Sequence, residues 1–242
     1  MTPDIVLVGP GRLGRTVYSA LQQAGWSVQM IGRGQAVPAH PLIWLTVPDR
    51  AIEAAARATP RGGVVLHASG ATDITPLRPH QPAGSLHPLM TFPGPEVATP
   101  PMTDLPAAVA GDPDAIAQAE RIAAAMGWMT FETGGDRTMY HAAAVIAGNY
   151  ATTLLGVAAR VLAATGVPEQ QAARLLAPLA LTSLKNAAEV GPQQALTGPV
   201  ARGDESVIEK HLRALRRADP EAAQVYNALL RATRGLGNAT EG

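Results

Sequence analysis

The sequence predicts an α/β fold with a doubly wound parallel sheet, followed by an all-helical region. Between residues 5 and 132, short runs of apolar and β-branched residues alternate with helical stretches, a pattern typical of parallel strands covered by helices. Beyond Asp136 the strand-like runs cease and only helical stretches follow. We place the boundary at the Gly134–Gly135 pair, which would act as a hinge between domains 1–134 and 135–242.

Composition narrows the classes of function. The chain has 242 residues, a formal net charge of +0 and 16% charged residues, so it lacks the basic surface typical of nucleic-acid binding. It has no cysteine, which excludes disulfides and thiolate chemistry, and its six histidines are scattered without the spacing of a metal site. The first residues lead directly into a strand, without a basic and apolar leader, so we expect a cytoplasmic protein.

The first strand leads into a glycine-rich turn. The apolar run 5–8 is followed by Gly9, Gly11 and Gly14, which fall at the G-x-G-x-x-G spacing, and a helix then extends to Gly25. In a Rossmann fold the first glycine permits the turn, the second admits a pyrophosphate and the third lets the helix pack close to the strand. We therefore predict a dinucleotide site, the alternative being a glycine-rich turn that binds nothing.

The end of the second strand indicates which dinucleotide binds. In NAD-binding folds an Asp or Glu here holds the ribose hydroxyl, but residues 16–47 contain neither. Arg33 follows the predicted strand 27–31, and Arg12 and Leu13 lie within the glycine-rich loop. An arginine at this position favours the 2′-phosphate of NADP(H), by about 1.5–3 kcal/mol or roughly 10- to 150-fold. Arg33 as a solvated turn residue is the alternative.

Two further strands should end at the same edge of the sheet. The predicted strands 42–47 and 64–68 are followed by Pro48 and Ser69, at the carboxyl edge where such folds bind ligands. Asp49 is expected to cap the next helix, while His67 lies within its strand and is expected in the core. The predicted cofactor-binding residues are therefore Gly9, Gly11, Arg12, Leu13, Gly14, Arg33, Val47, Pro48 and Ala68.

The fifth strand ends in a histidine. The strand 84–87 ends at His87, and Pro88 favours an extended backbone there. The proline-rich stretch 93–106 is interpreted as a surface loop, with a mobile flap as the alternative. A short strand at 107–110, a helix to Met126 and a strand at 128–132 complete the α/β part.

The second part is predicted to consist of helices 137–164, 169–190, 206–217 and 220–233. Residues 138–159 contain no Asp, Glu, Lys or Arg, and the stretch is long enough to span a bilayer. Because it is rich in Ala, Gly and Thr and contains His141 and Asn149, we interpret it as a central helix buried between packed neighbours.

A Rossmann domain joined to a helical domain of this size resembles a superfamily of reductases and dehydrogenases. Its members include pyrroline-5-carboxylate reductase, prephenate dehydrogenase, ketopantoate reductase and deazaflavin-dependent NADP oxidoreductases. More closely, the chain resembles a bacterial Rossmann-like family with a C-terminal domain of unknown function. This resemblance rests on the stretches 9–14, 85–92 (SLHPLMTF), 140–150 (YHAAAVIAGNY) and 196–204 (LTGPVARGD).

The resemblance implies roles for particular residues. His87–Pro88 resembles a Gly-x-His-Pro-Met stretch of prephenate dehydrogenases, in which the histidine hydrogen-bonds the reacting hydroxyl, and Ser69–Gly70 resembles the accompanying Gly-Ser turn. The stretch 197–204 is similar in position to a substrate-holding loop at the dimer interface of pyrroline-5-carboxylate reductases, but it keeps only the Thr and Pro. The Lys-x-x-x-Asn pair of hydroxyacid dehydrogenases is absent, and His141 and Asn149 occupy that helix instead.

The candidate catalytic residues are His87, His141, Asn149 and Ser69, and the candidate substrate-binding residues are Thr197 and Lys185. Histidine suits proton donation near neutral pH. His141 and Asn149 are eight residues apart, close to one helical face. For each histidine the alternative is a structural role, and for Lys185 it is a solvated surface position. Arg202 and Asp204 form either an ion pair within their loop or a contact across subunits.

These observations lead to an NADP(H)-dependent oxidoreductase that acts on a small carbonyl, hydroxyl or imine compound. The alternatives are an imine reductase of the pyrroline-5-carboxylate type and a non-enzymatic dinucleotide-binding sensor or scaffold. We expect a small-molecule substrate and a homodimer formed through the C-terminal helices, with no nucleic acid, membrane or metal partner.

Overall fold

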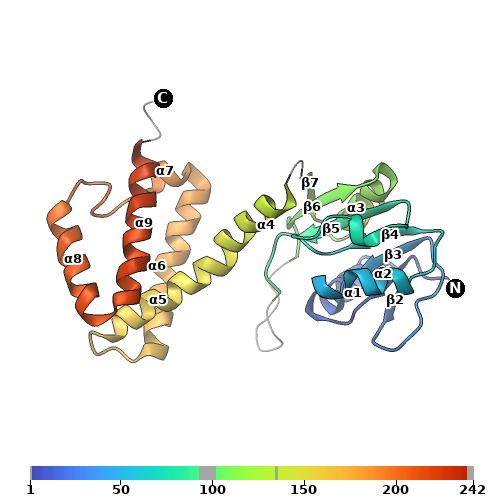
Figure 1. Ribbon diagram of the computed structural model, residues 1–242, viewed down its shortest axis with the longest axis horizontal. Coiled ribbons are helices and arrows are strands. Elements are labelled where there is room, and N and C mark those ends of the chain that lie inside the picture. The colour runs from blue at the N-terminus through green and yellow to red at the C-terminus, as the bar shows by residue number, and fades with distance from the viewer. Residues whose placement is uncertain (1, 93–101, 134–135, 239–242) are drawn as a thin grey trace. The chain divides into compact units, whose positions relative to one another are not determined.

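The computed structural model describes residues 2–92, 102–133 and 136–238, and it divides into two compact units. The first unit is Met1–Gly148 and the second is Asn149–Gly242 (Figure 1). The predicted hinge Gly134–Gly135 and most of the proline-rich stretch 93–106 lie outside the described residues.

The first unit is built on one seven-stranded sheet in the order β2-β1-β3-β4-β5-β6-β7. The strands are β1 (Ile5–Val8), β2 (Val28–Ile31), β3 (Leu42–Leu45), β4 (Val64–His67), β5 (Ala83–Pro88), β6 (Pro106–Gly111) and β7 (Met129–Glu132). The chain passes from β1 to β2, which lies on one side of β1, and then returns to β3, which lies on the other side of β1. Such a reversal opens a crevice at the carboxyl ends of β1 and β3, where α/β folds bind ligands.

The sheet is mostly parallel, but β6 runs antiparallel to β5. The sequence pattern predicted a fully parallel sheet, and this difference has a geometric reason. A parallel pair needs a long crossover, usually a helix, and the described residues between β5 and β6 contain none. Two glycines face each other across this pair: a Cβ on Gly111 would lie 2.5 Å from the Ala83 carbonyl oxygen.

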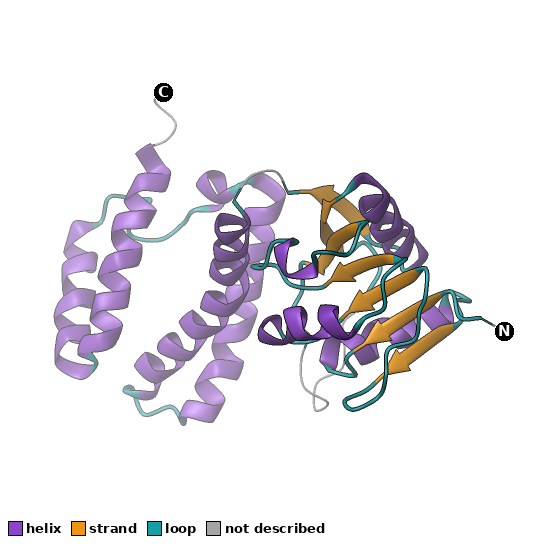
Figure 2. Cartoon of the chain, turned by 45° about the vertical axis from the view of Figure 1, so that its right-hand side comes forward, coloured by secondary structure: helices purple, strands orange, loops and turns teal. Residues whose placement is uncertain are grey.

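Helices cover both faces of the sheet (Figure 2). The first unit contains α1 (Arg12–Gln23), η1 (Asp49–Ala51), α2 (Ile52–Ala58), η2 (Thr75–Leu77), α3 (Pro113–Ala125) and α4 (Arg137–Val145). Alternate residues of β1 face opposite ways: Ile5 and Leu7 join the core beneath α1 and α3, whereas Val6 and Val8 join the core beneath α2. This continuous burial is what the apolar strand sequences predicted.

The second unit is wholly helical, as predicted. It contains α5 (Ala151–Ala163), α6 (Glu169–Val190), α7 (Pro192–Ala195), α8 (Glu205–Ala218) and α9 (Pro220–Asn238). Small residues such as Ala159 and Ala172 are buried, so helices can approach closely. Arg160 of α5 bonds Asp219 and Glu221 at the junction of α8 and α9.

The uncharged stretch differs from its prediction in two respects. A π-helical turn, Ile146–Tyr150, separates α4 from α5. The whole stretch, Arg137–Ala163, is the one described helix long and apolar enough to cross a membrane by length and composition. Only 6% of its apolar window is buried, so the expectation of a helix packed between neighbours is wrong for a single copy of the chain.

Candidate functional site

The glycine loop is fixed by close packing against β3. Gly9 has φ +112°, and a Cβ there would lie 2.8 Å from the Thr46 carbonyl oxygen. A Cβ on Gly14 would lie 2.0 Å from the Gly9 carbonyl oxygen. The Thr46 hydroxyl donates to that same Gly9 oxygen at 2.8 Å. Two of the three glycines are therefore required by the fold itself.

Gly11 is different, because the packing of the protein does not require it. A Cβ there would come no closer than 3.9 Å to the Thr46 carbonyl oxygen, and its φ of −71° suits any residue. Gly11 is the N-cap of α1 and supplies no side chain to the first N–H groups of the helix. An uncapped helix start beside an open backbone position fits the phosphates of a dinucleotide.

The remaining predicted cofactor residues lie along the carboxyl ends of β1–β4. Arg33 is exposed in the turn after β2, where the Gln35 side chain accepts a hydrogen bond from the Gly32 amide. Val47 and Pro48 follow β3, and the Ala68 amide after β4 donates to the Leu45 carbonyl oxygen. Arg12 is exposed and Leu13 half-buried at the start of α1. Asp49 lies in η1, which has no side-chain cap, so the expected capping role is not seen.

His87 and Tyr140 form a hydrogen-bonded pair at the far end of β5. Nδ1 of His87 lies 2.6 Å from the Tyr140 hydroxyl, and the two rings meet edge to face with centroids 5.6 Å apart. Tyr140 comes from the first turn of α4 and also contacts the ring of Phe131 on β7. Asp136 begins α4 by accepting a hydrogen bond from the Thr138 amide. The helix cap thus determines where the tyrosine stands.

Arg137 places a positive charge beside this pair. Its guanidinium carbon lies 5.5 Å from the centroid of the Tyr140 ring. Nη2 donates to the Ser69 carbonyl oxygen at 2.6 Å, and Nη1 donates to the Thr133 hydroxyl at 3.2 Å. No ion pair joins Arg137 to a carboxylate within the described part of the chain. Its hydrogen bonds therefore go to neutral acceptors, and the charge of Asp73 acts on it only from beyond ion-pair distance.

These surroundings decide the charge of both partners. Burial, reinforced by the charges of Arg137 and His141, lowers the pKa of His87 to about 4. Burial raises the pKa of Tyr140, with Arg137 opposing that rise. At neutral pH the pair therefore consists of a neutral imidazole and a neutral phenol.

Gly70 allows His87 and His141 to lie close to the β4 loop. A Cβ on Gly70 would lie 2.8 Å from both Cε1 and Nε2 of His87 and 3.0 Å from Cδ2 of His141. The predicted catalytic residues His87 and His141 are thus brought to one place. The neighbouring Ser69 hydroxyl accepts hydrogen bonds from the Ala71 and Thr72 amides, so it shapes the turn.

His67 is a core residue, as the sequence suggested. The Ser69 amide donates to its Nδ1, so Nε2 carries the proton and donates to the Asp73 carbonyl oxygen at 3.0 Å. The side chain is fully buried, and burial lowers its pKa to about 4. His67 is therefore a satisfied structural histidine.

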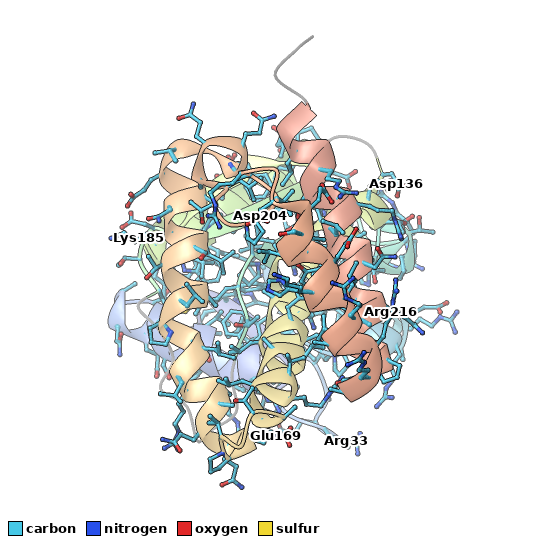
Figure 3. The ribbon with its side chains drawn as sticks, turned by 90° about the vertical axis from the view of Figure 1, so that its left-hand side faces the viewer. Arg33, Asp136, Glu169, Lys185, Asp204 and Arg216 are labelled. Atoms are coloured by element: carbon cyan, nitrogen blue, oxygen red, sulfur yellow. The ribbon has the colours of Figure 1, made fainter. Side chains whose placement is uncertain are left out.

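The other predicted site residues belong to the second unit. Asn149 is exposed in the π-helical turn, and Thr197 is exposed before α8. Lys185 points away from α6 (Figure 3), with its ammonium 3.8 Å from Glu189. Asp204 caps α8 through the Val207 amide, and no ion pair with Arg202 is found in the described ranges. Substrate binding by Thr197 and Lys185 stays a prediction.

Sequence reasoning missed Tyr140 and Arg137 as site residues. The available signal was a polar triplet, Arg137, Tyr140 and His141, at the start of an otherwise apolar helix that follows the last strand. The cluster of His67, Ser69, Gly70, His87, Arg137 and Tyr140 combines a proton-carrying pair with a fixed cation.

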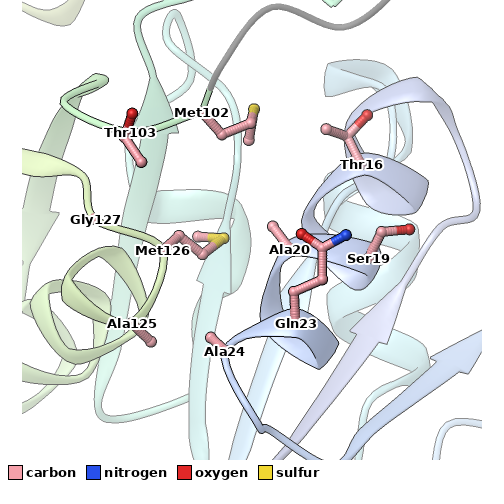
Figure 4. A pocket seen from close by; sticks show the side chains of 10 residues that line it. All are labelled: Thr16, Ser19, Ala20, Gln23, Ala24, Met102, Thr103, Ala125, Met126 and Gly127. Carbon is pink, nitrogen blue, oxygen red and sulfur yellow. The ribbon is translucent and has the colours of Figure 1, made fainter.

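A separate groove of about 730 Å³ lies between α1, the end of α3 and residues 102–103 (Figure 4). Its ten described lining residues carry no titratable side chain; they are Thr16, Ser19, Ala20, Gln23, Ala24, Met102, Thr103, Ala125, Met126 and Gly127. The groove therefore offers no acid–base chemistry. No group of three or more potential metal ligands occurs within the described ranges.

Comparison with known families gives one match. The family described as "Domain of unknown function (DUF2520)" matches residues 105–233, more than half of the chain. No curated protein matches the sequence at a significant level.

Solved structures share the fold over nearly the whole chain. Protein TM1727 from Thermotoga maritima is 22% identical, with a TM-score of 0.78 over 98% of this chain and 100% of that one. A reductive aminase from Aspergillus terreus, in complex with NADPH and ethyl levulinate, is 17% identical, with a TM-score of 0.65 over 97% and 95%. A 1-pyrroline-5-carboxylate reductase from Streptococcus pyogenes is 12% identical, with a TM-score of 0.59 over 96% and 98%. The predicted fold, with its Rossmann part and helical part, is confirmed.

Proposed function

The chain belongs to the DUF2520 family, and we propose that it is an NADP(H)-dependent oxidoreductase acting on a small carbonyl, hydroxyl or imine compound. One observation carries the proposal: the glycine loop and the histidine–tyrosine pair both lie at carboxyl ends of strands of one sheet. The first is suited to a dinucleotide, and the second to proton exchange with a substrate. Structural likeness to an NADPH-bound reductase supports the same class.

The residues that would hold the dinucleotide are those of the loop and its rim. Gly11 and the first N–H groups of α1 would receive the pyrophosphate, and Arg12 and Arg33 would pair with the 2′-phosphate. When bound, the nicotinamide supplies or accepts the hydride. His87 then has the task of holding the reacting oxygen or nitrogen by a hydrogen bond from its ring.

Cofactor binding is the first test. NADPH and NADH are titrated into the purified protein and followed by ligand fluorescence. We expect NADPH to bind at least about tenfold more tightly, because a charge-assisted hydrogen bond contributes about 1.5–3 kcal/mol. Arg33→Ala should remove the preference, whereas Arg61→Ala, an exposed arginine before β4, should leave it unchanged. If neither dinucleotide binds at about 100 μM, the affinity is far below that of a specific cofactor site, and the proposal is overturned.

Substrate panels separate the alternatives. The fold is shared with a reductive aminase and a pyrroline-5-carboxylate reductase, which favours an imine as the second candidate substrate. Turnover of cyclic imines but not of keto or hydroxy acids would select the imine reductase. Tight NADPH binding without turnover of any panel member, unchanged by His87→Ala, would select the non-enzymatic sensor.

We also propose that the protein forms a homodimer through its C-terminal helices. Helix α6 exposes large apolar side chains in the single chain, including Leu175 (56% exposed), Leu179 (66%) and Leu184 (57%). Patches of this kind usually mark an interface. Light scattering at micromolar concentration should give twice the chain mass of 25.0 kDa. Leu179→Glu should yield monomers and Gln170→Glu should not; a monomeric native protein would refute the proposal.

A further inference from the structure

We propose that Tyr140 supplies protons to His87: its hydroxyl donates to Nδ1, which leaves the proton of the ring on Nε2, the nitrogen that would donate to the substrate. This inference rests on the proposed function. It assigns a role to a tyrosine that lies 53 residues from His87 in sequence and is brought to it by the start of α4.

The geometry pairs Nδ1 of His87 with Tyr140, and the direction of this hydrogen bond is what we propose. The Tyr140 oxygen lies 2.6 Å from Nδ1, a length typical of a strong bond. The Cε1–Nε2 edge of His87 lies against Gly70, the position in the β4 loop that has no side chain. Nδ1 is thus turned to the tyrosine and Nε2 to the loop at the carboxyl ends of the strands.

The charge of His87 makes a second group necessary. A histidine with a pKa of about 4 is almost entirely neutral at pH 7, so it cannot act as a cationic acid. A neutral imidazole that gives up its Nε2 proton must receive another on Nδ1, or it becomes an imidazolate. Tyr140 is the group placed to supply it.

One proton passes from Tyr140 through His87 to the substrate. As hydride reaches the carbonyl carbon, the substrate oxygen forms an O–H bond with the proton leaving Nε2. Nδ1 takes the proton from the Tyr140 hydroxyl, and the imidazole stays neutral. The phenolate that remains lies beside the Arg137 guanidinium. Nδ1 then returns its proton to the phenolate, and Nε2 takes a proton from water, which restores the starting tautomer. For an imine, the same transfer forms an N–H bond.

Arg137 is the only cation among the described residues that contacts the Tyr140 ring. The charged and titratable groups that act on His87 are Arg137, His141, Asp49 and His67. Of these, Arg137 is held against Ser69 and Thr133 and is therefore fixed in place. It is therefore positioned to stabilise the negative charge of a Tyr140 phenolate.

The test measures the tautomer of His87 by ¹⁵N NMR in protein labelled at histidine, with the signal assigned by its loss in His87→Gln. We expect a bare Nδ1 and a protonated Nε2 in the native protein, and a mixture of both tautomers in Tyr140→Phe. The phenylalanine keeps the ring packing against Phe131, so folding is preserved. A proton on Nδ1 in the native protein would overturn the proposal.

The second readout is the turnover number, measured with a substrate identified in the panel. Tyr140→Phe should lower kcat by about 100-fold, in the range of general acid catalysis, with the Kd for NADPH unchanged. The solvent isotope effect on kcat should indicate two transferred protons in the native protein and one in Tyr140→Phe. Arg137→Lys, which keeps the positive charge, should lower kcat much less than Arg137→Gln does. An unchanged kcat in Tyr140→Phe would overturn the relay, whereas missing NADPH binding would overturn only the proposed function.

Discussion

The protein contains two histidine–tyrosine pairs with similar internal geometry and different surroundings. In the first unit, His87 and Tyr140 lie 2.6 Å apart, with ring centroids 5.6 Å apart at 89°. In the second unit, Nδ1 of His211 on α8 lies 3.1 Å from the hydroxyl of Tyr226 on α9, with centroids 6.0 Å apart at 86°. Judged by these contacts alone, the two pairs are nearly equivalent.

The difference lies in burial and charge. His87 is largely buried, and Arg137 stands beside its tyrosine, whereas His211 is exposed on the surface of a helical hairpin. The exposed side of the second pair is in contact with solvent, which screens nearby charges. A hydrogen-bonded histidine therefore becomes a candidate for catalysis through its environment, not through the identity of its partner.

Lowering the pH should affect the first unit most strongly. The pKa of His67 is about 4 in the folded state and about 6.5 in the unfolded state, so the unfolded state binds the proton first as pH falls. The contribution of neutral His67 to the free energy of unfolding is therefore complete above pH 6.5. It is lost between pH 6.5 and 4, by about 3 kcal/mol for this fully buried group. Urea unfolding followed by tryptophan fluorescence measures this directly, because Trp26, Trp44 and Trp128 all lie in the first unit.

The exposed histidine provides the control for that experiment. His211→Gln should leave the pH dependence of the tryptophan transition unchanged, and His67→Gln should weaken it. Equal free energies of unfolding at pH 7 and pH 4.5 would contradict the buried, neutral state of His67.

Gly70→Ala should break the first pair while sparing the second. The added Cβ would lie 2.8 Å from the His87 ring and 3.0 Å from His141, so one of them has to move. We expect a loss of about 1–3 kcal/mol, typical of overpacking, and displacement of the His87 ¹⁵N signals. Gly235→Ala in α9 is the matched control, since nothing lies within 4 Å of its Cβ, and helix propensity should make it neutral or stabilising. Native His87 signals in Gly70→Ala would show that the site tolerates a side chain there.

Tyr226→Phe should have the smallest effect of the three. Its hydroxyl bonds an exposed histidine, and such surface substitutions usually change stability by less than about 0.5 kcal/mol. Turnover and the tautomer of His87 should be unchanged, in contrast with Tyr140→Phe. A loss of activity in Tyr226→Phe comparable to that in Tyr140→Phe would remove the distinction between the two pairs.

Much of the fold was predictable because its signals are local. The strand sequences alternate with helical stretches at short spacing, and α6 was predicted with the bounds observed, Glu169–Val190. The glycine spacing predicted the loop between β1 and α1, and the histidine at the end of β5 was predicted as a site residue. The antiparallel β6 was not predictable from periodicity, since strand direction depends on how the connecting segment runs.

The sequence by itself determined the strand–turn–helix unit, the placement of His87 at a strand end and the apolar strands that form the core, because each depends on residues within a few positions of one another. Only the tertiary structure decided that Tyr140 and Arg137 reach His87 and Ser69, across 53 and 68 residues of sequence. It also decided that His87 is buried enough to be neutral at pH 7, whereas the side chain of His211 is exposed. Burial and long-range charge arise only when distant segments pack together, and no local pattern encodes them.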